Sequence, residues 1–411
     1  MSRILFMTSV YKQSDKGNLN VDLIDEFLRH GHKVDVVTPI ERKYKKQTEI
    51  YTDENLRVIR FKSLNFRGKV NIIEKGISTL SLGYQYKYIL NKHLKDRKYD
   101  IAIYTTLPIT YTPVIKELKN KYGTYCYLLH KDFFPQSAVD LGILNKNSLA
   151  YKLFRKIEKG LYKMSDTIGV MSQKNIDFIL ADNPYIDKSK VEICPNSINS
   201  MDITIIKRMK EDRDKIRNQY GIPLNNIVYV YGGNISRAQG IDYIIEIVKG
   251  FKKCNNSFLL FVGSGNEVEK LNEAIESSGS KNVKVINYLE KDKFDQLVAA
   301  CDVGLVFLDN RFTIANIPSR TLAHINMSQP ILAATDEFTD FKNIVEENEI
   351  GLWNSSNDIK TFFENVDSLT NNETLRNKLG FNARNYLINE CNTKKSYKII
   401  MSHFKQVERG K

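Results

Sequence analysis

The stretch that most constrains this chain is residues 227–248, IVYVYGGNISRAQGIDYIIEIV. Its first five residues are apolar or β-branched without interruption, which is typical of a strand buried on both faces. Gly232 and Gly233 follow, then a polar segment, and then isoleucines at helical spacing from Ile241 onward. The pattern predicts a strand, a glycine turn and a helix, as in a doubly wound α/β domain.

The glycine turn is a candidate phosphate site. The N-terminus of a helix presents free backbone N–H groups and the positive end of the helix dipole. Gly232 and Gly233 let the backbone approach a diphosphate closely, and Arg237 is the only full positive charge in the loop. Two glycines also suit a plain tight turn between a strand and its crossover helix, so this motif by itself leaves both readings open.

Length and cysteine usage fit a two-domain protein of the cytoplasm. The 411 residues suffice for two α/β domains of ordinary size. No uninterrupted apolar run reaches the roughly 18 residues that a membrane-spanning helix needs, and the short apolar N-terminus favours a first strand over a signal peptide. The five scattered cysteines are expected to be reduced, and most of them buried.

The positive charge is unevenly distributed. Residues 1–200 hold 33 Lys and Arg against 21 Asp and Glu, whereas the remainder holds 28 against 27. This excess predicts an anionic partner such as a nucleic acid, acidic lipid headgroups or a phosphorylated substrate, and no recognised nucleic-acid motif is present. A solubilising surface in a generally basic proteome is the alternative. Residues 72–94 mix apolar residues and tyrosines with lysines, and Lys95 follows. That segment fits either a helix on a membrane surface or one packed on its own domain.

The first half predicts a parallel sheet with polar residues at one strand end. Residues 3–10, 19–29 and 33–37 form a strand–helix–strand pattern. His130 and Asp132 come directly after a predicted strand at 125–129, at the carboxyl end where catalytic groups gather in such sheets. A carboxylate beside two aromatic residues and a proline needs a partner, although a loop or helix-capping aspartate is the alternative.

The second half repeats this architecture with a different sequence. Further strands are predicted at 258–262, 283–286, 302–308 and 330–334, with a helix near 318–327 and terminal helices at 382–388 and 396–407. Gly263 and Gly265 follow the first of these strands. We therefore predict an α/β protein with two doubly wound domains.

Several long motifs in one order carry a family resemblance. They are KDFFPQSAVDLG (131–142), PNSI (195–198), GNISRAQGID (233–242), RFTI (311–314) with PSR (318–320), and AATD (333–336). With them the chain resembles the family-four retaining glycosyltransferases of the GT-B fold. The likeness is to the bacterial branch that adds acetamido sugars, N-acetylfucosamine among them, to capsule and O-antigen repeat units.

The resemblance implies a fold and a domain plan. In the GT-B fold two Rossmann-like domains face a cleft. The expected domains are an acceptor-binding domain at 1–198, a nucleotide-sugar-binding domain at 199–385, and C-terminal helices at 386–411 that pack back towards the N-terminal domain.

The resemblance also implies a reaction. A sugar, an N-acetylated deoxyhexosamine by this likeness, moves from a UDP-sugar to a polyprenyl-diphosphate-linked sugar with retained configuration. No cofactor and no obligatory metal are expected, and no nucleic acid. The expected location is cytoplasmic, with the basic N-terminal domain on the inner face of the cell membrane. A nucleotide-sugar epimerase of similar shape and a basic binding protein are the alternatives.

The chain departs from the wider family at the donor site. Asn234 and Gln239 stand where an arginine and a lysine are usual, and Ala315 and Ala323 stand where two glutamates are usual. The positive charge for the diphosphate must then come from other residues. By position only, Asp309 and Asp336 join the candidates for holding the ribose and the sugar.

The predicted site residues follow from this resemblance and from the positions at the strand ends. Asp132 is the expected general base, with His130 in reserve. The expected donor-binding residues are Gly232, Gly233, Asn234, Arg237, Gln239, Gly263, Gly265, Arg311, Asn316, Ser319 and Arg320.

Overall fold

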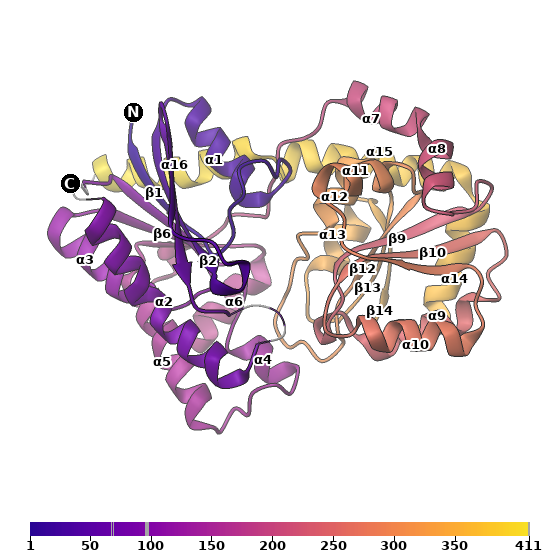
Figure 1. Ribbon diagram of the computed structural model, residues 1–411, viewed down its shortest axis with the longest axis horizontal. Coiled ribbons are helices and arrows are strands. Elements are labelled where there is room, and N and C mark those ends of the chain that lie inside the picture. Colours follow the sequence, from indigo (N-terminus) through magenta and orange to yellow (C-terminus); the bar gives the residue numbers. More distant parts are fainter. Residues whose placement is uncertain (67, 69, 95–97, 410–411) are drawn as a thin grey trace. The chain divides into compact units, whose positions relative to one another are not determined.

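The computed structural model describes residues 1–66, 68, 70–94 and 98–409, and it divides into two compact units. Unit 1 holds Met1–Ile198 together with Thr393–Lys411, and unit 2 holds Asn199–Asn392 (Figure 1). Unit 2 continues beyond residue 385 because its last helix, α15 (Glu373–Glu390), continues to Glu390.

Unit 1 is built on an eight-stranded sheet in the order β3-β4-β2-β1-β5-β6-β7-β8. All neighbouring strands are parallel except β3, which is antiparallel to β4. The strands are β1 (Arg3–Met7), β2 (Lys33–Glu41), β3 (Glu49–Asp53), β4 (Leu56–Ser63), β5 (Ile101–Thr105), β6 (Tyr125–Leu129), β7 (Thr167–Val170) and β8 (Val191–Ile193). The helices are α1 (Leu19–Arg29), α2 (Ile72–His93), α3 (Thr112–Tyr122), α4 (Gln136–Asp140), α5 (Leu149–Met164), α6 (Gln173–Asp182) and α16 (Thr393–Arg409).

Unit 2 is built on a six-stranded, fully parallel sheet in the order β11-β10-β9-β12-β13-β14. The strands are β9 (Ile227–Asn234), β10 (Ser257–Ser264), β11 (Val283–Ile286), β12 (Val303–Phe307), β13 (Ile331–Thr335) and β14 (Gly351–Ser355). The helices besides α15 are α7 (Ile203–Glu211), α8 (Arg213–Gln219), α9 (Ile241–Phe251), α10 (Val268–Ser278), α11 (Lys291–Ala299), α12 (Thr321–Asn326), α13 (Phe341–Glu347) and α14 (Ile359–Asn371).

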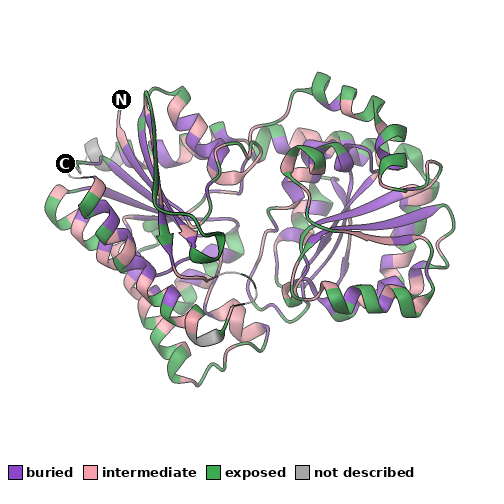
Figure 2. Ribbon diagram, in the orientation of Figure 1, coloured by how far each residue is buried: buried purple, intermediate pink, exposed green. Residues whose placement is uncertain are grey.

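Most strands of both units are buried along most of their length (Figure 2). Parallel strands covered by helices on both faces read as continuous apolar runs, and β5, β6, β12 and β13 are buried at every position. The predicted α/β class with two doubly wound units is therefore confirmed. All five cysteines are free thiols, and four of them are buried.

The last helix, α16, completes the core of unit 1. Its apolar residues Ile400, Met401 and Phe404 are buried in the same cluster as Phe27 of α1. The rings of His30 and Tyr397 stack with centroids 4.0 Å apart, which fixes α16 along α1.

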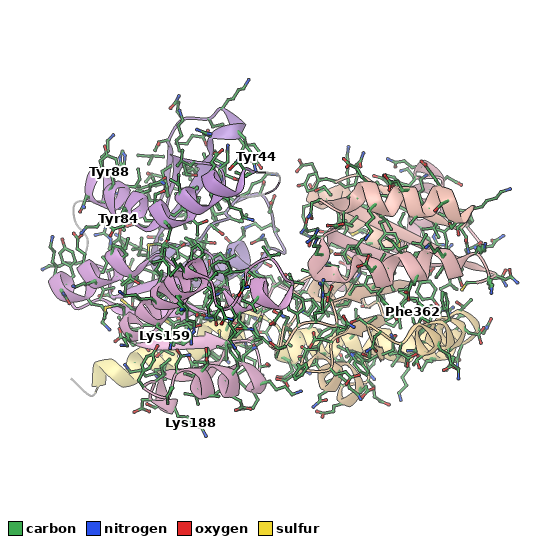
Figure 3. All side chains as sticks on the ribbon, turned by 90° about the horizontal axis from the view of Figure 1, so that it is seen from below. Tyr44, Tyr84, Tyr88, Lys159, Lys188 and Phe362 are labelled. Carbon is green, nitrogen blue, oxygen red and sulfur yellow. The ribbon has the colours of Figure 1, made fainter. Side chains whose placement is uncertain are left out.

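Helix α2 has both a buried and an exposed apolar face. Leu82, Tyr86 and Leu90 are buried in unit 1. Tyr84 and Tyr88 remain 68% and 61% exposed, and Figure 3 labels both on this helix. The side chains of Ile72 and Ile73, and Lys95 as a whole, lie outside the described residues. In the part of the chain that the structure describes, no helix combines the length and apolar character needed to cross a membrane.

Candidate functional site

The predicted site residues fall into two groups, one in each unit. The group in unit 2 lies at the carboxyl ends of β9 and β10, where Gly233 pairs with Gly263 in register. Gly233 has φ +135° and is exposed, and a Cβ on Gly263 would lie 1.9 Å from the Gly233 carbonyl oxygen. Gly263 is buried and lacks a side chain because the Gly233 carbonyl occupies that space, whereas the exposed Gly233 offers bare backbone to a ligand.

Gly232 and Gly265 have structural reasons for lacking a side chain. Gly232 is buried, and a Cβ there would lie 2.3 Å from the Phe294 ring. A Cβ on Gly265 would lie 1.9 Å from the Ile235 carbonyl oxygen. The missing side chain of Gly232 therefore makes room for the Phe294 ring. The expectation that it lets the backbone approach a diphosphate is wrong.

Gln239 shapes the loop rather than facing a ligand. It is buried, and its Oε1 accepts hydrogen bonds from the Ser236 backbone N–H at 3.1 Å and from the Ser236 hydroxyl at 2.8 Å. A short 3₁₀ turn, Arg237–Gln239, therefore separates the glycines from α9. Asn234 is exposed beside Gly233, and its carbonyl oxygen accepts the Tyr231 hydroxyl at 2.7 Å.

Arg320 is the cation placed against the glycine turn. Its Nη1 would lie 3.7 Å from a Cβ on Gly233, and its guanidinium carbon lies 4.8 Å from the centre of the Tyr231 ring. Nη1 is buried and has no hydrogen-bond partner among the described residues. Burial lowers the pKa of Arg320 to about 10, so it is still a cation at neutral pH. An uncompensated cation beside bare backbone is a ready anion site.

The other two candidate arginines are already paired. Arg311 forms a two-pronged ion pair with Asp309, with Nε–Oδ1 and Nη2–Oδ2 both at 2.8 Å. Arg237 is largely exposed and lies 3.5 Å from a Glu267 carboxylate oxygen. Of the three arginines, Arg320 is therefore the one whose charge no described carboxylate neutralises.

The residues named for the ribose and the sugar lie in the loops after β12 and β13. Asn316 is half-buried and donates to the Ile314 carbonyl at 3.1 Å, and Ser319 is exposed. Asp336 is buried, and its Oδ1 accepts the backbone N–H groups of Phe338 at 3.0 Å and Thr339 at 2.8 Å. Asp336 thus stabilises its own turn.

The group in unit 1 lies at the end of β6. One oxygen, Thr106 Oγ1, accepts the backbone N–H groups of both Lys131 and Asp132 at 2.9 Å. The Asp132 carboxylate accepts the Ser137 hydroxyl at 3.4 Å. Burial raises the pKa of Asp132 to about 6, against the lowering effect of hydrogen bonds from Ser137 and the Phe134 backbone. A carboxylate poised near neutral pH suits a general base.

His130 belongs to a buried hydrogen-bonded chain that ends on helix α5. Its Nε2 lies 2.7 Å from the Tyr162 hydroxyl, which donates to Glu158 Oε1 at 2.6 Å. Arg155, one turn earlier on α5, pairs with Glu158 and with Asp182. Burial lowers the pKa of His130 to about 3, so its imidazole is neutral at physiological pH. Because Tyr162 donates to Glu158, Nε2 carries the hydrogen and Nδ1 is an acceptor.

Removal of the Tyr162 hydroxyl tests this chain. Tyr162→Phe is expected to lower the free energy of unfolding by about 1–3 kcal/mol, because it leaves the His130 Nε2–H and a Glu158 oxygen buried without a partner. Denaturant unfolding measures the change. Tyr151→Phe on the same helix is the matched control, since the half-buried Tyr151 hydroxyl has no other hydrogen bond among the described residues than a long one of 3.4 Å to Gln136. Equal losses in both variants would contradict the assignment.

Sequence reasoning missed the residues that support the two groups. The sequence predicts Tyr231 only as part of a buried strand. Thr106 and Tyr162 lie far along the chain from His130 and Asp132, the residues that they contact. The spacing of Arg155, Glu158 and Tyr162 on one helical face was the available signal. Among the described residues, no cluster of histidine, cysteine and carboxylate side chains could hold a metal ion.

Comparisons with known proteins agree on the class of protein. Residues 212–386, within unit 2, match the family model described as Glycosyl transferases group 1. The chain is 24% identical over 288 residues to the probable glycosyltransferase WbjE of Pseudomonas aeruginosa, covering 70% of this chain and 69% of that one. It is 24% identical over 135 residues to the putative colanic acid biosynthesis glycosyl transferase WcaI of Escherichia coli, covering 33% of each.

Solved structures share the fold over nearly the whole chain. Sucrose-phosphate synthase from Thermosynechococcus elongatus has a TM-score of 0.74 at 14% identity and covers both chains completely. Anabaena HepE in complex with UDP and glucose has a TM-score of 0.69 at 14% identity and covers 99% of this chain and 100% of that one. At such identities the likeness shows the fold alone, and that fold is the predicted GT-B fold.

Proposed function

We propose that this chain, a glycosyltransferase with a group 1 domain in unit 2, transfers a sugar from a UDP-sugar to a polyprenyl-diphosphate-linked sugar with retention of configuration. The observation that carries the donor half of the proposal is the uncompensated Arg320 cation beside Gly233. The donor sugar that fits the family likeness is an N-acetylated deoxyhexosamine, and the product is a capsule or O-antigen repeat unit.

The donor diphosphate lies on the bare backbone at Gly233. Arg320 stabilises the negative charge that develops on the leaving phosphate as the sugar–phosphate bond breaks. Since the cation is held in place by the Tyr231 ring, little reorganisation is needed at that moment. The Anabaena protein that shares this fold was solved with UDP bound, which supports UDP as the nucleotide of choice.

Asp132 accepts the proton of the attacking acceptor hydroxyl. Its carboxylate is available at neutral pH because its pKa, though raised, lies near 6. Neutral His130 is fully buried at the same strand end and supports it through its contact with the Tyr162 hydroxyl.

The lipid-linked acceptor and the membrane contact are supported by unit 1. On α2, Ile77, Leu80, Tyr84 and Tyr88 are exposed at helical spacing, with Lys92 5.7 Å from the centre of the Tyr88 ring. Aromatic and basic residues on one face suit the headgroup region of a membrane. The colanic acid name of one relative supports a role in polysaccharide synthesis.

A comparison of nucleotides tests the donor site. UDP is expected to raise the melting temperature, whereas GDP, ADP and TDP at equal concentration are not, because a ligand that binds only the folded state stabilises it. At one hundred times its dissociation constant the gain is about 2.7 kcal/mol. Absence of a shift with all four nucleotides at millimolar concentration would remove the donor site from the glycine turn.

Product analysis tests the reaction itself. Incubation of the protein with a UDP-sugar and a polyprenyl-diphosphate-linked sugar is expected to yield a lipid extended by one sugar, with the anomeric configuration of the donor. Incubation with the UDP-sugar alone is expected to leave the sugar unchanged. A changed sugar without any acceptor would mean an epimerase instead.

A further inference from the structure

A cavity of about 1090 Å³ lies in unit 2, away from the glycine turn. Residues of α7 and α15, the helices labelled in Figure 1, line it. Its floor is formed by the segments at 299–302 and 328–330, which immediately precede β12 and β13. All strands of this sheet are parallel, so the cavity lies at the amino ends of the strands and the glycine turn at their carboxyl ends. The eight residues of β9 separate the two ends by about 26 Å.

Among the described residues, four cations on the walls of this α7–α15 groove form no ion pair with a carboxylate. Lys207 and Lys210 lie three residues apart on α7, and Arg376 and Arg384 face them from α15. The arginines donate to neutral groups: Arg376 to backbone carbonyls of Leu369 and Thr370, and Arg384 to Asn326 and the Met201 carbonyl. Within the described residues none of these four cations forms an ion pair, although Asp202 attracts Arg384 and Asp302 attracts Lys210 over a longer range.

The carboxylates of the groove are engaged elsewhere. Asp302 accepts Arg217 Nη2 at 2.6 Å and the Val228 backbone N–H at 2.7 Å. Asp202 caps α7 by accepting the Thr204 backbone N–H at 2.7 Å and its hydroxyl at 2.6 Å. Glu373 is in the first turn of α15. Two of the three carboxylates are therefore committed to the fold, and the groove keeps a positive excess.

The groove walls reduce the hydration of two of these charges. Desolvation lowers the pKa of Lys210 and of Arg384, although the nearby Asp302 and Asp202 act in the opposite direction. Phe381, which is 66% exposed, lies on the same stripe of α15 as Arg384 and offers apolar surface to the organic part of a ligand. Cations that lose hydration without gaining a counter-charge are stabilised by a bound anion.

We propose that the α7–α15 groove binds an anion carrying two or more phosphate groups. Lys207 and Lys210 hold it from one wall, and Arg376 and Arg384 hold it from the other. The anion comes either from a free phosphorylated molecule or from a lipid headgroup, and both offer the same oxygens to the four cations. This site is separate from the donor site and does not depend on the proposed transfer reaction.

Titration of tripolyphosphate into the full chain tests the site, with UDP present at saturation to fill the glycine turn. The titration is repeated with the Arg320→Met variant, whose glycine turn lacks its cation. Tripolyphosphate is then kept from the glycine turn even if UDP does not bind there. Single-site binding is expected, weakened at least about tenfold in the Lys207→Gln, Lys210→Gln double variant. The double variant Lys249→Gln, Lys360→Gln removes the same charge from exposed positions outside the groove and is expected to bind normally.

Vesicles of cardiolipin, whose headgroup carries two phosphates, and phosphatidylcholine form the second arm of the test. If tripolyphosphate does not bind but vesicle binding falls only in the groove variant, the anion is a lipid headgroup. The inference is overturned if both double variants bind both probes alike, or if neither probe binds the wild-type chain. Melting temperatures of all variants, and recovery in Lys207→Arg, Lys210→Arg, separate loss of the site from loss of folding.

Discussion

Replacement of Asp132 by asparagine is expected to lower kcat about 10²- to 10⁴-fold, because asparagine cannot accept the proton of the attacking hydroxyl. The fold of the turn should survive, since Thr106 Oγ1 holds the two backbone N–H groups without help from the carboxylate. Initial rates of transfer from the UDP-sugar to the lipid-linked acceptor measure the effect, and the melting temperature checks the fold.

Asp140→Asn is the matched control for this substitution. Asp140 lies in the same segment, at the end of α4, and accepts the Gln136 amide at 2.8 Å. The same chemical change there is expected to leave kcat within about twofold, as for most substitutions away from a site. Full activity in Asp132→Asn, or a similar loss in both variants, would exclude Asp132 as the base.

The pH dependence of the reaction follows from the same carboxylate. Burial raises the pKa of Asp132 to about 6, so the group is protonated below that pH and unable to act as a base. kcat/KM is therefore expected to fall as pH decreases through about 6, whereas an aspartate at the ordinary value of about 3.9 would stay active to near pH 4.5. Ser137→Ala removes a hydrogen bond that lowers this pKa, and the acid limb should move upward. A flat profile down to pH 4.5 would contradict the assignment.

Much of the fold could be predicted because buried parallel strands are apolar at every position. Runs such as 101–105 and 303–307 have this pattern, and the structure places β5 and β12 there. The strand β3 was not predicted, because all of its residues are exposed and it lies at the sheet edge. Helices α7 and α8 were also missed. Helix α7 has only nine residues and Ile206 alone is buried, so its apolar pattern of Ile203, Ile206 and Met209 is short.

The candidate site was less predictable than the fold, because pairing in space decides what a charged residue can do. Arg311 and Arg320 looked equivalent in the sequence, but Asp309 neutralises the first and no described carboxylate neutralises the second. Gln239 stands where the family pattern has a basic residue, but its side chain accepts the Ser236 backbone N–H and so stabilises its own loop. The contacts that distinguish these roles join separate loops, and no local pattern records them.

Replacement of Arg320 by methionine is expected to lower kcat/KM about 10²- to 10³-fold, because it removes the cation that stabilises charge on the leaving diphosphate. Methionine is unbranched and fills much of the same space against Tyr231. UDP should also lose most of its effect on the melting temperature. Arg237→Met is the matched control. Arg237 is exposed and paired at 3.5 Å, so its removal is expected to cost only a few-fold in rate.

Stability distinguishes this role from a structural one, because the two make opposite predictions. A buried cation whose Nη1 has no partner weakens the ligand-free fold, so its removal should leave the free energy of unfolding unchanged or raise it by about 1–3 kcal/mol. Removal of a structural arginine would instead lower the free energy of unfolding. Arg217 is such a residue, because it is fully buried and donates hydrogen bonds to Asp302 and to four backbone carbonyl groups. Denaturant unfolding of Arg320→Met without nucleotide decides the matter. A marked loss of stability together with unchanged UDP binding would place Arg320 in the fold alone, whereas lost binding with undiminished stability identifies a residue kept for its ligand.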